Sequence, residues 1–315
     1  MKYIETLREG EKLGDIYLCK SRQSALTKSG KSYENVILQD KTGTLDAKIW
    51  DPGSPGIGDL TTLDYVYVVG DVTSFPGFPA AFHQTRTRAE EGEYDPADYL
   101  PMSRKDIDEM YEELLKYMRK VKNPYLLKLA ESFFVENEAF IRLFKKHSAA
   151  KSVHHGFVGG LLEHTLSVVK LCDFYADQYD FLNRDLLITA AMFHDIGKTK
   201  ELSAFPANDY TDDGQLLGHI VIGVELVGLG IRRIPDFPKT SGQRAQALHR
   251  GSSRRAGIRF PEETGSRRGS SLNFADNTDA RMETFREILT GSATTDEWLG
   301  YNRFVDSNVR RTTEF

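Results

Sequence analysis

Ala190-Ala-Met-Phe-His-Asp-Ile-Gly-Lys198 is the stretch that decides the fold of the larger, C-terminal part of this chain. Apolar residues fill a helix-forming segment up to His194, and two polar residues of the metal-ligand type then follow together. His194 offers a neutral nitrogen, and Asp195 offers two oxygens that can bridge two ions. Lys198 follows His194 by four residues, so it shares the same face if the helix continues. A His-Asp pair recurs by chance, but this context predicts a metal centre.

A second histidine lies upstream in a helix predicted over Phe157–Tyr179. That helix is apolar over so much of its surface that we expect it to be buried. His164 lies within it, one turn after Gly160, whose missing side chain leaves space above the imidazole. Alone, His164 is better explained as a hydrogen-bonded core histidine. Beside His194-Asp195 it becomes a candidate ligand.

Two downstream segments add candidates. In Leu272-Asn-Phe-Ala-Asp-Asn-Thr-Asp279 the carboxylates lie on or beside an apolar helical face, and a buried carboxylate needs a cation or several donors. A salt bridge or a helix cap is the simpler explanation for either one, and we favour Asp276 over Asp279 as a ligand. His219 stands in Leu216-Leu-Gly-His-Ile-Val-Ile222, where core and ligand interpretations are balanced.

His154 and His155 precede a Gly-Gly turn, where they either touch a phosphate or cap the following helix. The helical candidates His164, His194 and His219 give three imidazoles, and at least two carboxylates lie with them on buried helical faces. Such a donor set suits Mn²⁺, Fe²⁺ or Mg²⁺. A bound ion would lower the pKa of its water and neutralise phosphate charge. The chain has neither a Walker-type phosphate loop nor a dinucleotide fingerprint.

The first ninety residues have the short strands and glycine-rich connections of a small closed barrel. Leu45, Ala47 and Ile49 alternate with polar residues and Trp50, which is the period of a half-buried strand. The OB-fold is the commonest five-stranded barrel of this kind. The five strands are predicted at Lys12–Lys20, Tyr33–Asp40, Gly43–Trp50, Tyr65–Val72 and Ala80–Arg88.

Helical periodicity follows an acidic, proline-bearing stretch. Ser103 is expected to cap the first helix, and Asn123-Pro124 to end it. The fold class is therefore a multidomain α+β chain: a five-stranded OB-type β-barrel for nucleic-acid binding over residues 1–90, a linker over 91–103, and an all-α domain over 104–315. Further helices are predicted at Pro124–Phe134, Glu136–His147, Phe157–Tyr179, Arg184–His194, Gly214–Val227 and Leu272–Leu289.

An OB barrel binds single strands by stacking bases on aromatic side chains in a basic groove. Trp50, Phe75 and Phe78 are the candidates that we select. Most aromatics of a small barrel belong to its core, so packing explains each one more simply. Phe75-Pro-Gly-Phe-Pro79 is the exception, because a Pro/Gly loop seldom buries two phenylalanines.

Composition excludes several classes of protein. No apolar run is long enough to span a membrane, and the N-terminus has no apolar signal core. The two cysteines, Cys19 and Cys172, have no metal-motif spacing and are expected to be reduced thiols in a cytoplasmic protein. A formal net charge of −5 does not by itself indicate a nucleic-acid binder.

The histidines and aspartates resemble those of the HD superfamily of metal-dependent phosphohydrolases. The barrel and the motif flanks more narrowly resemble YhaM-type 3′→5′ exoribonucleases: His154-His155, Gly159-Gly160-Leu161, His164, His194-Asp-Ile-Gly-Lys198, Leu217-Gly-His219 and Ala275–Ala280. The likeness implies that His164, His194, Asp195 and Asp276 hold a first metal, and that Asp195 and His219 contribute to a second. It implies Asp195 and Lys198 as catalytic residues, and His154, His155, Lys198 and Asp279 as substrate contacts. It also implies a homo-oligomer that degrades RNA or single-stranded DNA from the 3′ end, with Mn²⁺ favoured.

Residues 238–271 depart from this family. Relatives have an amphipathic helix there that ends in a His-His-Gly ligand pair, whereas this window lacks helical periodicity and holds only His249. It carries eight Lys and Arg residues between Lys239 and Ser271 against two Glu. We favour a pair of compensating frameshifts over a genuine basic loop that attracts RNA phosphates. If the window is genuine, the second metal site loses two ligands.

Three functions follow in order of preference. The first is a metal-dependent 3′→5′ exonuclease on RNA or single-stranded DNA. The second is a hydrolase of nucleotides or small phosphate esters that uses the barrel for assembly. The third is a nucleic-acid-binding protein with an impaired metal site. A basic, aromatic barrel groove favours the first, a closed pocket for one nucleotide the second, and salt-dependent binding without turnover the third.

Overall fold

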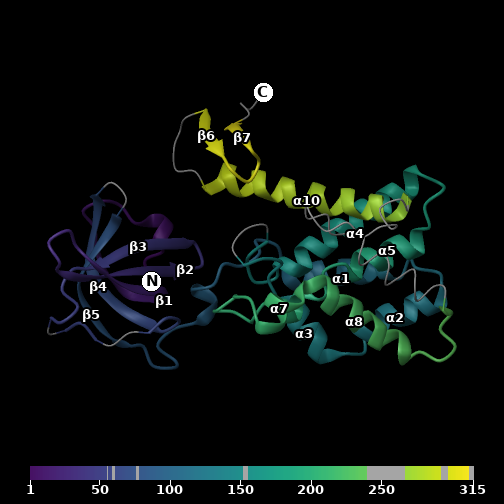
Figure 1. Ribbon diagram of the computed structural model, residues 1–315, viewed down its shortest axis with the longest axis horizontal. Helices are drawn as coiled ribbons and strands as arrows, with labels where there is room; N and C mark the ends of the chain where they lie inside the picture. The colour runs from purple at the N-terminus through teal and green to yellow at the C-terminus, as the bar shows by residue number, and fades with distance from the viewer. Residues whose placement is uncertain are drawn as a thin grey trace. The chain divides into compact units, whose positions relative to one another are not determined.

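The computed structural model describes residues 1–54, 56–58, 61–75, 78–151, 155–239, 267–291 and 297–311. The chain separates into two compact units (Figure 1). The first comprises Met1–Met102 with Phe205–Ala207, and the second comprises Ser103–Ala204 with Asn208–Phe315. His154, His249 and residues 240–266 of the anomalous window lie outside the described residues.

The first unit is a curled, largely antiparallel β structure. Strand β1 pairs antiparallel with β2 and β4, β2 with β3, and β4 with β5, while β3 and β5 run parallel. The strands close on themselves in the order β1-β2-β3-β5-β4. Their bounds are β1 Lys12–Leu26, β2 Ser32–Asp40, β3 Gly43–Ile49, β4 Tyr65–Phe75 and β5 Phe78–Arg88.

Alternation along the strands places one apolar set inside the barrel. In β3 the side chains of Leu45, Ala47 and Ile49 are buried, whereas Trp50 just after the strand is exposed. Tyr17 is fully buried in the same core, where its hydroxyl donates to the backbone carbonyl of Lys2. The three apolar residues predicted to face inward are therefore buried, but Lys48 between Ala47 and Ile49 is buried as well, with its ammonium group 3.3 Å from Asp46. Strand β1 runs six residues beyond its predicted end at Lys20.

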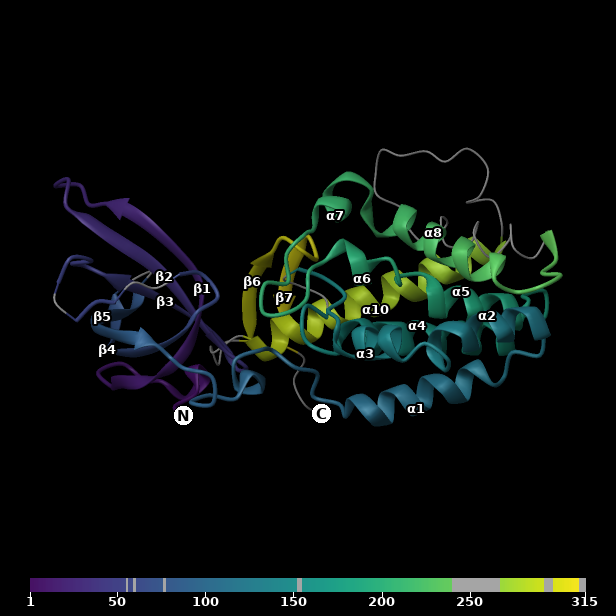
Figure 2. The ribbon, with the colours of Figure 1, turned by 90° about the horizontal axis from the view of Figure 1, so that it is seen from below.

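The second unit is helical, as expected, and its longest helix, α10, lies across α4 and α5 (Figures 1 and 2). Its apolar core is continuous from α1 through α10. The helices are α1 Ile107–Met118, α2 Pro124–Phe134, α3 Glu138–Lys146, α4 Gly160–Gln178, α5 Arg184–Phe193, α6 Lys198–Glu201, α7 Asp212–Leu216, α8 Gly218–Arg232 and α10 Arg267–Gly291.

Three details differ from the prediction. Asp106, and not Ser103, caps α1, because its carboxylate accepts from the backbone N–H groups of Asp108 and Glu109. The helix predicted over Gly214–Val227 is two helices, since Gly218 has a φ of 72° and turns the chain between α7 and α8. A short hairpin, β6 Trp298–Asn302 with β7 Ser307–Arg310, follows α10 where only helices were predicted.

None of the helices in the described ranges combines the length and apolar character needed to cross a bilayer.

Candidate metal centre

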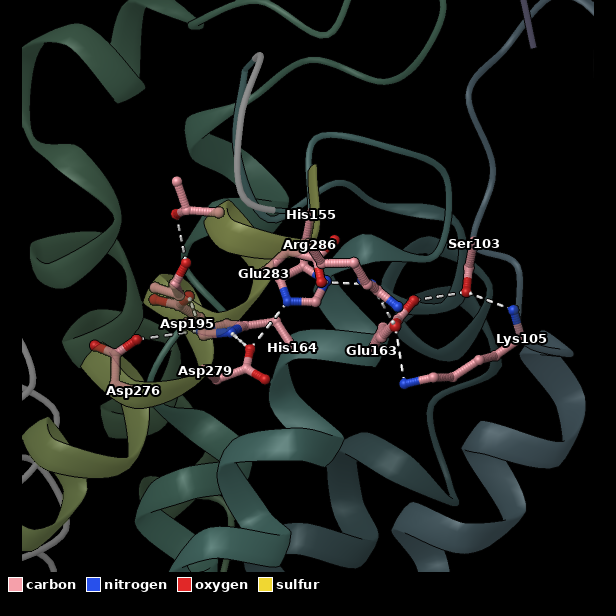
Figure 3. Close-up of polar contacts among 12 residues, drawn as sticks. Ser103, Lys105, His155, Glu163, His164, Asp195, Asp276, Asp279, Glu283 and Arg286 are labelled. Atoms are coloured by element: carbon pink, nitrogen blue, oxygen red, sulfur yellow. Dashed lines mark hydrogen bonds and ion pairs between the residues drawn. The ribbon is translucent and has the colours of Figure 1, made fainter. Parts of the chain in front are cut away.

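Three helices and the end of a fourth bring the candidate ligands together. His164 projects from α4, His194 and Asp195 follow α5, His219 lies on α8, and Asp276 and Asp279 lie on α10. Figure 3 shows His164 between the aspartates of α10 and Asp195. The helices meet because their apolar faces share one core, and this packing brings the polar residues beside those faces together.

His194 is fully buried at the end of α5. Its Nδ1 lies 2.7 Å from the carbonyl oxygen of Ala191. Because a carbonyl can only accept, Nδ1 carries the proton and Nε2 of the neutral ring keeps its lone pair. That Nε2 lies 3.1 Å from Nε2 of His164 and 3.5 Å from Oδ2 of Asp195.

His164 presents the same kind of atom to the centre. Its Nδ1 lies 2.7 Å from Asp279, which leaves Nε2 facing inward. Nε2 lies 3.4 Å from Oδ2 of Asp195 and 3.2 Å from Oδ1 of Asp276. One ligand atom each from His164, His194 and Asp195 lies within 4.8 Å of the others. Two imidazole lone pairs and two carboxylates therefore face each other, an arrangement that fits a divalent cation.

The charges of the centre are strongly coupled. Burial would raise the pKa of the Asp195 carboxyl, but Lys198, 2.6 Å away, and the neighbouring rings hold that pKa well below its usual value. The pKa of Asp276 is likewise lowered, because His164 and His194 outweigh burial. Burial lowers the pKa of His194. It acts in the same direction on His164, but Asp195, Asp276 and Asp279 together raise the pKa of that ring well above its ordinary value.

His219 approaches Asp195 from the other side. Its Nε2 lies 3.7 Å from Oδ1 of Asp195, whereas His164 and His194 face Oδ2. Glu201 accepts from both Nδ1 and the backbone N–H of His219, at 2.9 and 3.0 Å. The two oxygens of Asp195 thus face two different sets of histidines. This is the arrangement expected of a carboxylate that bridges two ions.

Gly197 explains why α8 comes so close. A Cβ atom at this position would lie 1.9 Å from the backbone carbonyl oxygen of His219. The space beside Gly197 is therefore taken by the backbone of α8. Gly160 was expected to leave space above His164, but a Cβ there would lie 1.9 Å from the carbonyl oxygen of His155, so this space too is taken by backbone.

Comparison with known proteins agrees with this geometry. The HD domain family model matches residues 161–281, which hold all the candidate metal ligands. A 3′-5′ exoribonuclease YhaM of Bacillus subtilis is 30% identical over 283 residues, covering 89% of this chain and 88% of the relative. The YhaM of a Geobacillus species is 31% identical over 290 residues, covering 89% and 86%. That of Bacillus velezensis is 32% identical over 216 residues, covering 68% of each.

The chain belongs to the YhaM family of HD-domain proteins. It is accordingly a metal-dependent hydrolase.

Two residues assigned to substrate lie behind the centre of this YhaM-family chain. His155 is buried, with 2% of its surface exposed, and its Nε2 lies 2.9 Å from Oδ2 of Asp279. The same oxygen accepts from His164. Both residues therefore contact the candidate ligand His164.

The three aromatic residues predicted to stack on bases belong to the first unit. They are Trp50, Phe75 and Phe78. Trp50 is 47% exposed and stacks on Tyr33, with ring centroids 5.2 Å apart and planes at 30°. Phe75 and Phe78 pair through their backbones where β4 meets β5, and their side chains lie outside the described part of the structure.

Two carboxylates at the centre were not predicted from the sequence. Glu201 accepts a hydrogen bond from His219. It lies seven residues after His194, and this spacing could have identified it. Glu163 is buried beside His164 and accepts from the Ser103 hydroxyl at 2.7 Å (Figure 3). It also pairs with Lys105 at 2.9 Å and Arg286 at 3.2 Å. A charged residue inside an apolar helix was the signal for Glu163.

Proposed function

We propose that this chain is a 3′→5′ exonuclease that hydrolyses phosphodiester bonds of RNA or single-stranded DNA with bound Mn²⁺, for which Fe²⁺ or Mg²⁺ can substitute. One observation carries the proposal. Nε2 of His164 and Nε2 of His194 face each other 3.1 Å apart, between the carboxylates of Asp195 and Asp276. The YhaM relatives are 3′-5′ exoribonucleases, and this likeness supports the direction of degradation and the polymer.

In this proposal His164, His194, Asp195 and Asp276 hold the first ion, and Asp195 and His219 contribute to a second. Ions held there would lower the pKa of a bound water molecule and neutralise phosphate charge. The carboxylate of Asp195 joins the two sides of the site, because its Oδ2 faces His164 and its Oδ1 faces His219. Glu201 orients the His219 ring by accepting from Nδ1, so that Nε2 faces Asp195.

Lys198 supplies the remaining charge. Its ammonium group lies 2.6 Å from Oδ2 of Asp195, and its side chain is 18% exposed. When Asp195 binds metal, the ammonium is in place to attract a phosphate oxygen of the scissile ester as a point charge. Asp195 and Lys198 are therefore the proposed catalytic residues.

We propose that residues 1–90 form an OB-type domain that guides the strand, that 91–103 form a linker, and that 104–315 form the HD phosphohydrolase domain. The strand order β1-β2-β3-β5-β4 supports the OB assignment. The stacked Tyr33–Trp50 pair offers a base a ring to stack on, because Trp50 lies at the end of β3 and half of it is exposed. Phe75 and Phe78 remain candidates for the same role.

We further propose a cytoplasmic homo-oligomer. The two free, buried cysteines support a reducing compartment. Light scattering after gel filtration measures the oligomeric state, and a monomer at micromolar concentration contradicts it.

Degradation of a 5′-labelled single-stranded RNA with Mn²⁺ tests the function. A ladder that shortens from the 3′ end, absent in His194→Ala and Asp195→Ala, is the expected result. A matched single-stranded DNA compares the two polymers, and a nucleoside monophosphate ester tests the small-substrate alternative. Salt-dependent strand binding without cleavage would identify a binding protein instead.

The departure at residues 238–271 has its own test. We propose compensating frameshifts, and sequencing of the template DNA checks them. A clean reading frame between Pro238 and Leu272 would contradict that origin and make the basic window a genuine part of this chain.

A further inference from the structure

The carboxylate of Asp279 joins two histidine rings behind the proposed metal centre. Its Oδ2 lies 2.9 Å from Nε2 of His155 and 2.7 Å from Nδ1 of His164. We infer that Asp279 is a positioning residue that fixes His164 in its Nδ1–H tautomer, and that His155 fixes Asp279 in turn. This inference rests on the proposed metal site and extends it to residues that do not touch the ion.

The chemistry of the donors carries the first step. An ionised carboxylate oxygen can only accept, so both ring nitrogens that face Oδ2 of Asp279 donate. Metal ligation requires a neutral ring, and in the neutral ring with Nδ1 protonated the lone pair lies on Nε2. Nε2 of His164 faces Oδ1 of Asp276 at 3.2 Å and Nε2 of His194 at 3.1 Å. A carboxylate behind a ligating histidine fixes the ring and raises the basicity of the opposite nitrogen.

His155 is itself firmly held, which carries the second step. It has a φ of 64°, in the left-handed region that side chains seldom adopt. Its carbonyl accepts from the backbone N–H of Ala149 at 3.0 Å and lies where a Cβ of residue 160 would be. Only a glycine at position 160 lets α4 begin against this backbone. The backbone that carries the His155 ring is therefore fixed. The hydrogen bond from this ring restricts rotation of the Asp279 carboxylate.

A metal ion between His155, His164 and Asp279 is the competing arrangement, because their ligand atoms also lie within 4.8 Å of one another. It would require His164 to bind one ion through Nδ1 and another through Nε2, which demands a doubly deprotonated ring. The two hydrogen bonds to Asp279 satisfy the same atoms with a neutral ring. The geometry therefore favours positioning over a further metal site.

Direct Mn²⁺ binding tests the inference without using activity. The free Mn²⁺ signal in electron paramagnetic resonance titrations gives the affinity of the wild type, Asp279→Leu and Asp279→Asn. We expect Asp279→Leu to lower the affinity by about 10- to 100-fold. Asp279→Asn keeps an acceptor but loses the charge, so we expect a smaller loss. Asp180→Asn, an exposed aspartate in the same unit, is the matched control and should bind as the wild type does.

The tautomer of His164 separates a positioning role from a merely structural one, because a merely structural role of Asp279 would leave that tautomer unchanged. Long-range ¹H–¹⁵N spectra of the Mg²⁺-loaded protein, which has eight histidines, report which nitrogen of each ring is protonated. His164 should be the Nδ1–H form in the wild type and a mixture in Asp279→Leu. His155→Gln, which can still donate to Asp279, should retain more Mn²⁺ affinity than His155→Phe.

Unchanged Mn²⁺ affinity and an unchanged tautomer in a folded Asp279→Leu or Asp279→Asn protein would overturn the positioning role. Failure of the proposed function looks different. A wild-type protein that binds no Mn²⁺ would remove the metal centre, and the role of Asp279 with it. A wild type that binds Mn²⁺ but cleaves no RNA would leave the role of Asp279 intact.

Discussion

Arg286 lies 3.2 Å from the Glu163 carboxylate, seven residues after Asp279 on the same helix. Seven residues are about two helical turns. Glu163 and His164 are neighbours in α4, so α10 is held to α4 at two points, one through Arg286 and one through Asp279 (Figure 3). The first point contains no metal ligand, yet it fixes the helix that carries Asp276 and Asp279.

Glu163→Ala should therefore destabilise the protein more than an ordinary ion pair would suggest. Glu163 is buried, and it accepts from Ser103, Lys105 and Arg286. Loss of these charge-assisted bonds should lower the free energy of unfolding by about 2–4 kcal/mol. Urea unfolding measures the change.

The matched control for Glu163 is Glu113→Ala. Glu113 pairs with Lys170 at 2.7 Å, but the side chains of Glu113 and Lys170 are 40% and 42% exposed. An exposed pair is worth about 0–1 kcal/mol. Equal losses in the two variants would mean that Glu163 does not hold α10.

Gly197→Ala should lower the rate of cleavage about 100-fold while leaving a folded protein. The added Cβ would meet the carbonyl oxygen of His219 at 1.9 Å, so α8 must move away and carry His219 from Asp195. A shift of about 1 Å at a reacting centre costs about 100-fold in rate. The rate of RNA cleavage under Mn²⁺ measures the loss. Gly53→Ala, where nothing lies within 4 Å of the new Cβ, should cleave at the wild-type rate.

The candidate ligands could be selected from the sequence because they interrupt apolar patterns. His164 lies on a buried, largely apolar part of α4, and His194 and Asp195 directly follow an apolar run at the end of α5, so each of these polar residues was conspicuous. The same contrast identified β3, where Leu45, Ala47 and Ile49 alternate with polar residues. Periodicity reports which face is buried, and here the buried faces meet.

The periodicity of a helix shows which of its faces is buried, but not which residues of other segments that face contacts. The partners of Asp279 come from positions 155 and 164, far away in the chain, so its hydrogen bonds to both histidines could not be predicted from its own helix. Glu201 was overlooked because its partner His219 lies beyond a turn and another helix. The roles of Gly160 and Gly197 depend on the backbone of a different segment, which no local pattern contains.

Mn²⁺ should stabilise the native protein. Its proposed ligands come from α4, α5 and α10, so the ion binds only when these helices are assembled. At a free concentration 100 times the Kd, one ion adds about 2.7 kcal/mol to the free energy of unfolding. Thermal unfolding with and without Mn²⁺, and after chelation with EDTA, measures this. Asp195→Ala should show little shift with Mn²⁺, and a shift as large as that of the wild type would place the ion elsewhere.

Both cysteines should be unreactive in the native protein. Cys19 and Cys172 are fully buried, and burial raises the pKa of the Cys19 thiol to about 11 and that of Cys172 further. The thiolate is the reactive form, so at pH 8 both the charge state and access oppose reaction. Titration with a disulfide reagent should detect two thiols only after unfolding. Rapid labelling of one thiol in the native state would contradict the buried position of that cysteine.

Trp50→Ala should weaken binding of a single strand without changing the metal centre. Trp50 stacks on Tyr33 and leaves 47% of its surface exposed, so a base can stack on it. Stacking of one base is worth about 1–3 kcal/mol, which is roughly a 5- to 150-fold rise in the Kd for RNA or in KM. Trp298→Ala is the matched control, because Trp298, 60% exposed, lies in the β6-β7 hairpin of the other unit. Fluorescence anisotropy of a labelled strand measures the Kd, and Mn²⁺ affinity should be the same in both variants. If Trp298→Ala weakens RNA binding and Trp50→Ala does not, the strand runs over the hairpin rather than over the barrel.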